Sequence, residues 1–179
     1  MADAYLKVKD NGANGLELVR DSSEISVIKR SLAKYAKADL IDLYHNQNKV
    51  DTTRYGVTFT WNDDRTECTI VGTCPSDAAE DAYELLAYYP GRLELPEGFT
   101  AGKTYHAKIA STGDEVHLQC LKYVNGSHSG FIFSITAAND PNGVDFTIPN
   151  DAGSVLIRFA VAKGHTASET VTEATICEV

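Results

Sequence analysis

The sequence has little positive charge and no long hydrophobic run. Its 179 residues include 16 Lys and Arg against 25 Asp and Glu, a net charge of −9. Nucleic-acid-binding proteins need a positive surface to contact phosphates, so this balance argues against nucleic acids and anionic membranes as partners. No apolar run approaches the roughly 18–20 residues of a membrane span. Residues 1–5 lack the basic start and apolar segment of a secretory signal, which predicts folding in a cytoplasm.

The sequence also lacks the cysteine spacing of metal and redox sites. Its four cysteines form no CxxC pair and have no histidine at a ligand offset: Cys68, Cys74, Cys120 and Cys177. Three of them fall inside alternating runs, where a free cysteine behaves as a small apolar residue. We therefore expect buried free thiols. A Cys68–Cys74 disulfide is the alternative, and it would require an oxidising compartment.

No catalytic signature stands out. There is no nucleophile elbow and no phosphate-binding glycine loop, and no carboxylate pair can be placed across a cleft. His106 and His117 flank a turn at 111–114, but a zinc site needs two more ligands. Residues 139–145 offer several oxygens without the closing Glu of a calcium loop, so a turn is expected there. We predict no enzyme activity, no metal and no cofactor.

The hydrophobic period changes near residue 50. Before it, residues 21–48 are typical of an amphipathic helix, because apolar residues recur at spacings of three and four. Asp21 and Glu24 match a capping box at its start. The apolar stripe is predicted to mediate self-association through Ile25, Ile28, Leu32, Leu40 and Leu43. The helix would either pack on its own domain or form a short coiled coil between copies, whose heptad seam Asp39 and Asp42 interrupt.

Residues 1–20 precede this helix as two short alternating runs around the turn-rich segment 10–15. The pattern predicts a hairpin, or an extended arm that pairs with a partner's sheet edge. The apolar residues predicted to dock this segment to a partner are Tyr5, Leu6, Val8, Leu16, Leu18 and Val19.

Beyond a linker at 49–54, short alternating runs continue to the C-terminus. Turn residues separate them about every 8–12 residues, which is typical of an antiparallel sandwich or jelly roll. The expected strands are 55–61, 66–72, 82–89, 91–95, 103–110, 115–123, 129–137, 144–148, 154–162 and 168–178. The segment 76–88 has a helix-favouring composition. The predicted fold is therefore mainly β: an N-terminal arm (1–20), a helix with linker (21–50) and an antiparallel, jelly-roll-like β-sandwich (51–179).

Several motifs in the β region occur in a fixed order. Gly-Val-Thr-Phe-Thr at 56–60 is followed by Asn-Asp-Asp at 62–64 and Ile-Val-Gly-Thr at 70–73. Leu-Pro-Glu-Gly at 95–98 then precedes Gly-Lys-Thr-Tyr at 102–105, and the closing runs are 144–149 and 155–162. This order resembles a β-sandwich module found in tailed-bacteriophage virion proteins, and the likeness covers most of the sandwich.

The resemblance implies a role in head fibres, capsid decorations or tail and baseplate appendages. It implies a jelly-roll-like domain, a homo-oligomer that is most often a trimer, and contact with a phage capsid or tail protein. Some such domains are expected to touch host glycans. The chain would then be a structural protein of the virion, made in the host bacterial cytoplasm.

A carbohydrate-binding module is the alternative. Aromatic rings stack on sugars, and neighbouring polar groups bind the hydroxyls. Tyr88 and Tyr89 lie before a Pro-Gly turn, and neighbours in a strand point to opposite faces. The candidate glycan-binding residues are Tyr88, Tyr89 and Tyr105; packing of these rings in the core is the other interpretation.

Overall fold

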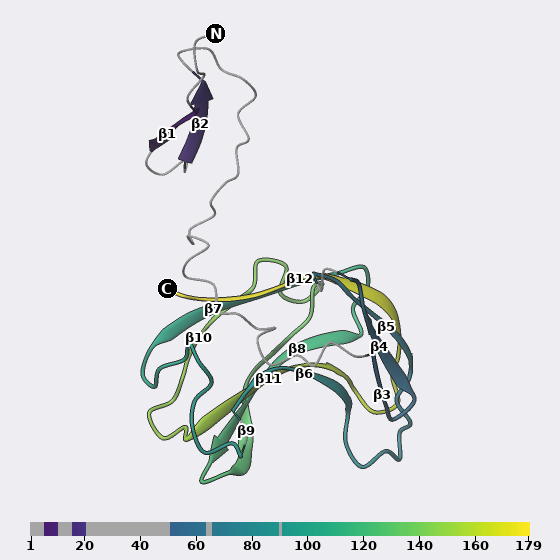
Figure 1. Ribbon diagram of the computed structural model, residues 1–179. Helices are drawn as coiled ribbons and strands as arrows, with labels where there is room; N and C mark the ends of the chain where they lie inside the picture. Colours follow the sequence, from purple (N-terminus) through teal and green to yellow (C-terminus); the bar gives the residue numbers. More distant parts are fainter. Residues whose placement is uncertain (1–5, 11–15, 21–50, 64–65, 90) are drawn as a thin grey trace. The chain divides into compact units, whose positions relative to one another are not determined.

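The computed structural model describes residues 6–10, 16–20, 51–63, 66–89 and 91–179 (Figure 1). The chain divides into two compact units, Met1–Leu40 and Ile41–Val179. The predicted helix at 21–48, with Ile25, Ile28, Leu32, Leu40 and Leu43, lies outside the described residues, as does Tyr5. No described residue belongs to a helix long and apolar enough to cross a membrane.

The first unit contains a two-stranded hairpin. β1 (Leu6–Asp10) pairs antiparallel with β2 (Leu16–Arg20), and the register places Val8 opposite Leu18 and Lys7 opposite Val19. Of the two predictions for the segment, arm or hairpin, the backbone pairing agrees with the hairpin. The docking role of its apolar residues stays a prediction.

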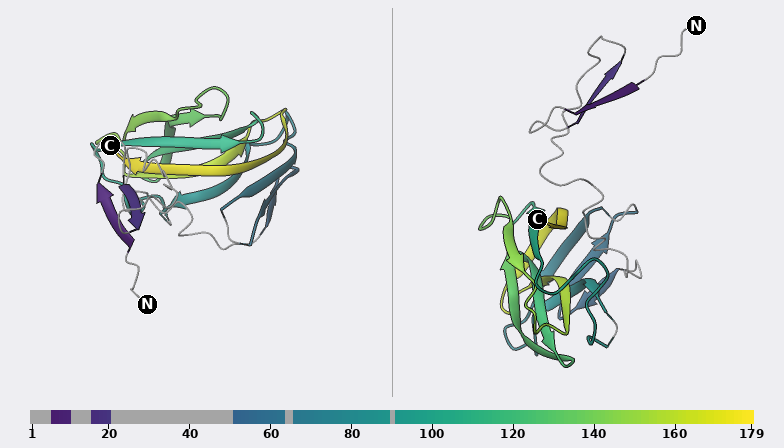
Figure 2. Two further views of the ribbon diagram at one scale, coloured as in Figure 1. Left: turned by 90° about the horizontal axis from the view of Figure 1, so that it is seen from above. Right: turned by 90° about the vertical axis from the view of Figure 1, so that its left-hand side faces the viewer.

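The second unit consists of two antiparallel sheets, with a core between them (Figures 1 and 2). The six-stranded sheet has the order β10-β7-β12-β5-β4-β3. Its strands are β3 (Thr52–Arg54), β4 (Val57–Trp61), β5 (Cys68–Thr73), β7 (Thr104–Ser111), β10 (Val144–Thr147) and β12 (Thr166–Glu178). The four-stranded sheet has the order β6-β11-β8-β9. Its strands are β6 (Ala82–Tyr88), β8 (Val116–Val124), β9 (Ser127–Ile135) and β11 (Ser154–Val161).

Alternating apolar residues of both sheets meet in this core. Phe59 and Ile70 from the larger sheet, with Leu118 and Phe159 from the smaller one, are fully buried. Phe133 of β9 and Phe146 of β10 have ring centroids 4.6 Å apart and so join the two sheets at one end. The alternating pattern therefore predicted a mainly β fold of two antiparallel sheets correctly.

Two segments differ from the prediction. Residues 91–95 form no strand, because the backbone turns there: the Arg92 amide donates to the Tyr89 carbonyl at 2.9 Å, and Gly91 and Arg92 have positive φ angles of 84° and 56°. Conversely, part of the predicted linker is strand β3. Its Thr52 hydroxyl donates to the buried Glu84 of β6. This bond links the edge strand of one sheet to the edge strand of the other.

Candidate ligand-binding cleft

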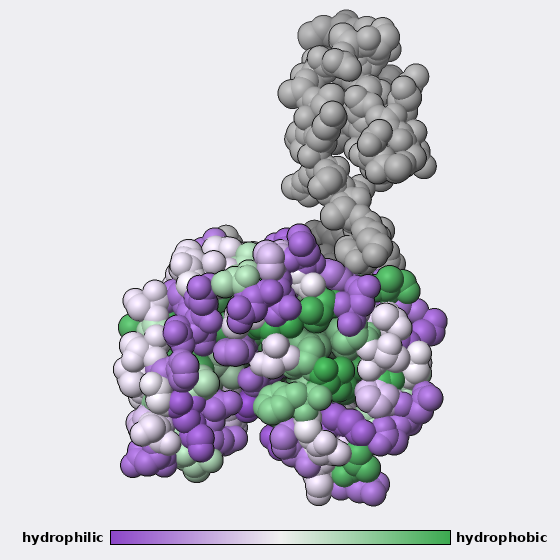
Figure 3. Space-filling model, turned by 180° about the vertical axis from the view of Figure 1, so that it is seen from behind, coloured by the Kyte–Doolittle hydropathy of each residue, from purple (hydrophilic) through white to green (hydrophobic). Residues whose placement is uncertain are grey.

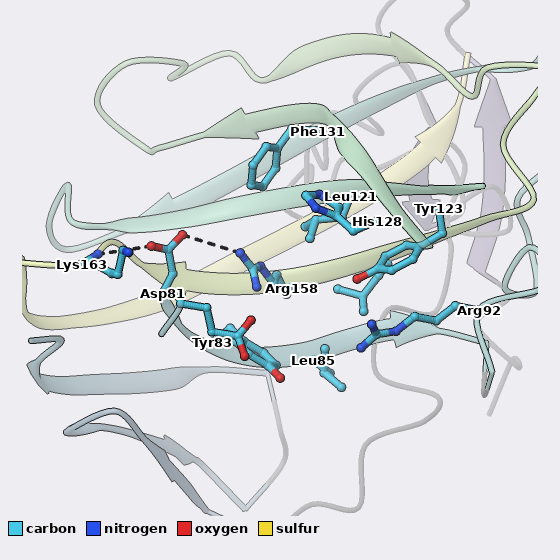
Figure 4. Close-up of a pocket in the computed structure, with 12 residues that line it drawn as sticks. Asp81, Tyr83, Leu85, Arg92, Leu121, Tyr123, His128, Phe131, Arg158 and Lys163 are labelled. Carbon is cyan, nitrogen blue, oxygen red and sulfur yellow. Dashed lines mark hydrogen bonds and ion pairs between the residues drawn. The ribbon is translucent and has the colours of Figure 1, made fainter. Parts of the chain in front are cut away.

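A cleft of about 420 Å³ lies on the outer face of the four-stranded sheet (Figure 4). All four strands supply residues to it, two each: Tyr83 and Leu85, Leu156 and Arg158, Leu121 and Tyr123, and His128 and Phe131. Loop residues at the strand ends complete the lining: Glu80, Asp81, Arg92 and Lys163. This volume falls in the range of small-molecule sites, roughly 300–1,000 Å³.

Strand register brings these residues together. Leu156 of β11 lies opposite Leu121 of β8, which lies opposite Phe131 of β9. Two residues further along β11, Arg158 lies opposite Leu85 of β6 on one side and opposite Gln119 of β8 on the other. Because every second residue of a strand points to the same face, four distant segments build one surface.

Arg158 is the centre of a polar network in the floor of the cleft. Its Nε donates to Gln119 Oε1 at 2.8 Å, and its guanidinium lies 3.6 Å from the Asp81 carboxylate. Gln119 in turn donates to the Ser134 hydroxyl at 3.3 Å. The Arg158 side chain is only 8% exposed. Burial lowers the pKa of its guanidinium, and the nearby Asp81 carboxylate opposes that shift.

Guanidinium groups cover two of the tyrosine rings. Arg54 and Arg158 lie over the Tyr83 ring, 4.4 and 5.0 Å from its centroid. Arg92 lies over the Tyr123 ring at 4.7 Å. Cation–π contacts of this kind are most favourable when partly desolvated, so they hold the arginines in fixed positions.

Phe131 offers an aromatic surface that these contacts leave open. It is 52% exposed, although it is a large apolar residue, and its ring stands edge-on to His128 at 5.7 Å. His128 also neighbours Tyr123 at 5.7 Å. Tyr123, His128 and Phe131 therefore form a continuous aromatic series along one side of the cleft (Figure 4).

The cleft thus combines a polar network in its floor with apolar and aromatic side chains in its lining and charged groups at its margin. Figure 3 shows a face of the domain on which hydrophobic residues gather centrally among hydrophilic ones. A cleft with the mixed lining seen in Figure 4 can bind ligands by stacking on apolar rings and by hydrogen bonding to polar atoms. The arrangement can bind and orient a ligand. Among the described residues, no group of three or more His, Cys, Asp or Glu side chains is placed to hold a metal ion.

The three tyrosines predicted to bind glycans lie in different environments. Tyr88 lies on the same outer face and packs, half-buried, against the cluster of Leu121, Tyr123 and Leu156. Tyr89 follows β6 and is 38% exposed. Neither lines the cleft.

Tyr105 requires a correction. It is fully buried between the sheets, where its hydroxyl donates to the Gly98 carbonyl at 3.2 Å and accepts from the Thr100 amide at 2.8 Å. Its ring packs against Phe99 and Phe146. No face of this ring is left for a sugar, so Tyr105 is a core residue.

His106 and His117, which flank the turn at 111–114 in the sequence, are not cross-strand neighbours. His106 lies on β7 of the six-stranded sheet, and His117 on β8 of the four-stranded sheet. Each has its own contact: His106 Nδ1 lies 2.7 Å from Asp145, and His117 Nδ1 lies 3.1 Å from the Ser134 hydroxyl. In the segment 139–145, a turn is closed by the Gly143 amide, which donates to the Asp140 carbonyl at 2.9 Å, and β10 begins at Val144.

The cysteines are free and buried. None of the four forms a disulfide. Burial raises the pKa of the Cys68 thiol to about 12, and the Glu84 and Asp51 carboxylates add to this shift. Burial also raises the pKa of the Cys120 thiol. These thiols are therefore apolar core groups and poor nucleophiles.

Comparison with known proteins assigns no family. No family model matches the sequence, and no curated protein matches it. Among solved structures, the fold is similar to a chain in the crystal structure of accessory secretory proteins 1, 2 and 3 of Streptococcus pneumoniae. The identity is 14% and the TM-score 0.48, over 78% of this chain and 96% of that one. Similarity at this level indicates no function.

Proposed function

We propose that this chain is a display and adhesion protein whose β domain binds carbohydrate in the cleft on its four-stranded sheet. The observation that supports this most directly is the exposed Phe131 ring beside a cleft with a polar floor. An exposed aromatic face stacks on the apolar face of a pyranose ring. The arginine, carboxylate and amine groups around it match the donors and acceptors that sugar hydroxyls require.

The cleft is suited to binding and not to turnover, and we propose no catalytic activity. Arg158, Gln119 and Asp81 contact one another, so their polar atoms hold the floor in place. A preformed site of this kind lowers the entropy lost when a ligand binds.

A glycan array tests the binding proposal. The wild-type domain is expected to bind a subset of glycans, and Phe131→Ala to weaken that binding about tenfold or more, because the stacking surface is removed. Tyr89→Ala is the matched control, since it truncates another exposed aromatic residue outside the cleft. Absence of binding to every glycan would overturn the proposal, and loss of binding in Tyr89→Ala alone would move the site to the end of β6.

We further propose that the protein is a structural component of a bacteriophage virion, a head fibre, capsid decoration or tail appendage. The sequence resemblance supports this role. The order of the strands is consistent with a jelly-roll-like domain, because the chain passes repeatedly from one sheet to the other between β5 and β12. Residues 1–20 would dock the chain to a capsid or tail protein, residues 21–48 would associate copies, and the β domain would be displayed on the particle.

Deletion of residues 1–20 tests the attachment. The shortened chain should fold and keep its glycan binding, but fail to enter particles. Incorporation at the wild-type level would show that the hairpin is not the attachment site. Light scattering of the purified full chain tests the proposed homotrimer, and a monomeric mass would overturn it.

A further inference from the structure

We propose that the ligand of the cleft is an acidic sugar, and that Arg92 binds its carboxylate. This inference rests on the proposed carbohydrate binding and adds the charge of the ligand and the residue that recognises it.

The cleft has the opposite charge to the rest of the chain. The whole protein carries a net charge of −9. The cleft lining has three cationic side chains, Arg92, Arg158 and Lys163, against two carboxylates, Glu80 and Asp81. A local excess of positive charge in a concave, partly buried surface attracts anions and strengthens their binding.

The cations differ in how far they are already neutralised. Arg158 is buried and engaged by Asp81 and Gln119. In contrast, neither Arg92 nor Lys163 forms a side-chain ion pair with any described carboxylate, although Asp81 accepts a hydrogen bond from the Lys163 backbone amide. Arg92 lies at one end of the cleft and Lys163 at the other (Figure 4). Within the part of the chain that the structure describes, the half-buried Arg92 therefore has no carboxylate partner.

The backbone holds Arg92 in a conformation that a non-glycine residue rarely adopts. Its φ angle is 56°, and it ends a tight turn in which its amide donates to the Tyr89 carbonyl. Strained backbone of this kind is concentrated at ligand sites, where the strain fixes the position of a side chain. Here it places the guanidinium over the Tyr123 ring at 4.7 Å, so that the group is pre-oriented before a ligand arrives.

The guanidinium and the stacking surface are connected along the cleft. Arg92 covers Tyr123, Tyr123 neighbours His128, and His128 neighbours Phe131. A short oligosaccharide that stacks one sugar ring on Phe131 would thus extend along the cleft toward Arg92. Arginine binds carboxylates through two parallel hydrogen bonds, because its planar guanidinium matches the carboxylate geometry and the opposite charges strengthen both bonds.

A singly charged acid fits this cleft better than a phosphorylated or sulfated sugar cluster. Glu80 and Asp81 also line the cleft and would repel additional negative charge. Lys163, which is exposed at the opposite end, is too solvated to offset that repulsion. One unneutralised, half-buried guanidinium matches one carboxylate.

Matched pairs of ligands test the inference. Oligosaccharides containing a uronic or sialic acid are compared with their carboxyl-reduced forms by calorimetry, with the full wild-type chain. The acidic form should bind at least tenfold more tightly at 0.15 M salt, and the difference should shrink at 0.5 M salt. Arg92→Gln should abolish the preference and keep weak binding of both forms, and Arg92→Lys should restore part of it. Lys163→Gln is the control and should keep most of the preference.

The outcomes separate this inference from the function on which it rests. Equal binding of acidic and reduced forms would overturn the acidic-sugar inference and leave carbohydrate binding in place. A preference for phosphorylated or sulfated sugars, or an unchanged preference in a folded Arg92→Gln variant, would also overturn it. If no sugar of either kind binds, carbohydrate binding itself fails. Urea unfolding of both Arg92 variants establishes that each is folded.

Discussion

Arg158 Nε donates a hydrogen bond to Gln119 Oε1 at 2.8 Å between directly opposed positions of β11 and β8. Both residues are buried, at 6% exposure, on the outer face of a sheet, where polar residues ordinarily face water. The pair therefore contributes in two ways. It satisfies two polar groups that would be costly to bury alone, and it fixes the floor on which the cleft is built.

The first prediction concerns this pair. Arg158→Met removes the charge and the donor but keeps much of the apolar volume. It should lower the free energy of unfolding by about 2–3 kcal/mol, because Gln119 keeps a buried oxygen without its donor and Asp81 loses its cation. Urea unfolding followed by Trp61 fluorescence measures the change.

A double-mutant cycle provides the control. Arg158→Met with Gln119→Leu replaces both partners by apolar groups, and it should be more stable than Arg158→Met alone. Additive losses from the two substitutions would show that the hydrogen bond has no coupling energy, and the description of the floor as a network would then be wrong.

Glu169 is the subject of a second prediction. One of its oxygens accepts from the amides of Glu115 and Val116 at 2.9 and 3.1 Å, and the other accepts from the Ser111 hydroxyl. This buried carboxylate thus fixes the loop between β7 and β8. Glu169→Leu should cost about 2–4 kcal/mol of unfolding free energy, because it leaves these donors without an acceptor. Glu169→Gln should cost less, since the amide oxygen can accept both backbone bonds and the Ser111 hydroxyl can reorient. Equal losses for the two variants would contradict this assignment.

A third prediction compares two glycines with positive φ. A Cβ at Gly72 would lie 2.1 Å from the Gly56 carbonyl oxygen, whereas a Cβ at Gly130 would meet nothing within 4 Å. Their φ angles, 136° and 124°, are similar. Gly72→Ala should therefore separate β4 from β5 and cost about 3 kcal/mol or more, and Gly130→Ala only about 1 kcal/mol of backbone strain. Thermal unfolding of both variants tests the difference, which would vanish if the close approach were unimportant.

The cysteines give a fourth prediction, which needs no substitution. All four are buried and free. Ellman's reagent at pH 8 should therefore label almost none of them in the folded protein and all four in denaturant. Rapid labelling of one thiol in the folded protein would place that cysteine at the surface.

The alternation of polar and apolar residues within a regular strand is sufficient to predict which side chains face the core. In the run from Thr104 to Ile109, the polar residues Thr104, His106 and Lys108 alternate with Tyr105, Ala107 and Ile109. The alternation alone places Tyr105 with the core residues, so the signal that excluded it from a surface site was present. In β6 the register with β11 shifts between Ile157 and Arg158, which brings Tyr88 to the outer face. An irregularity of this kind reverses which residues of the strand face the core, and simple alternation along the sequence does not predict where it occurs.

The cleft itself could not be predicted, because it depends on the order of strands within the sheet. Tyr83, Arg158 and Phe131 lie on strands distant in sequence, and only the order β6-β11-β8-β9 brings them together. Local alternation specifies which residues share a face of a strand, not which strands are neighbours. The position of Arg92 in the cleft could not be predicted either. Its segment was predicted to be a strand, whereas the backbone turns at Gly91.

The last prediction concerns pH. Glu84 is buried, and burial raises the pKa of its carboxyl above its usual value, although the Thr52 hydroxyl and the Arg54 charge oppose the shift. In the folded state this group therefore holds its proton to higher pH than in the unfolded state. Between the two pKa values the folded state binds more protons, so the contribution of Glu84 to stability falls as pH rises through that window.

Glu84→Gln should remove this dependence. The neutral amide can still accept from Thr52, and it carries no charge to desolvate at neutral pH. The variant should thus gain unfolding free energy relative to wild type at pH 7, and gain less or none at pH 4, where wild-type Glu84 is protonated. Urea unfolding of both proteins at the two pH values gives this difference, in which the effects of all other groups cancel. A gain of equal size at both values would mean that burial of the Glu84 charge does not limit stability.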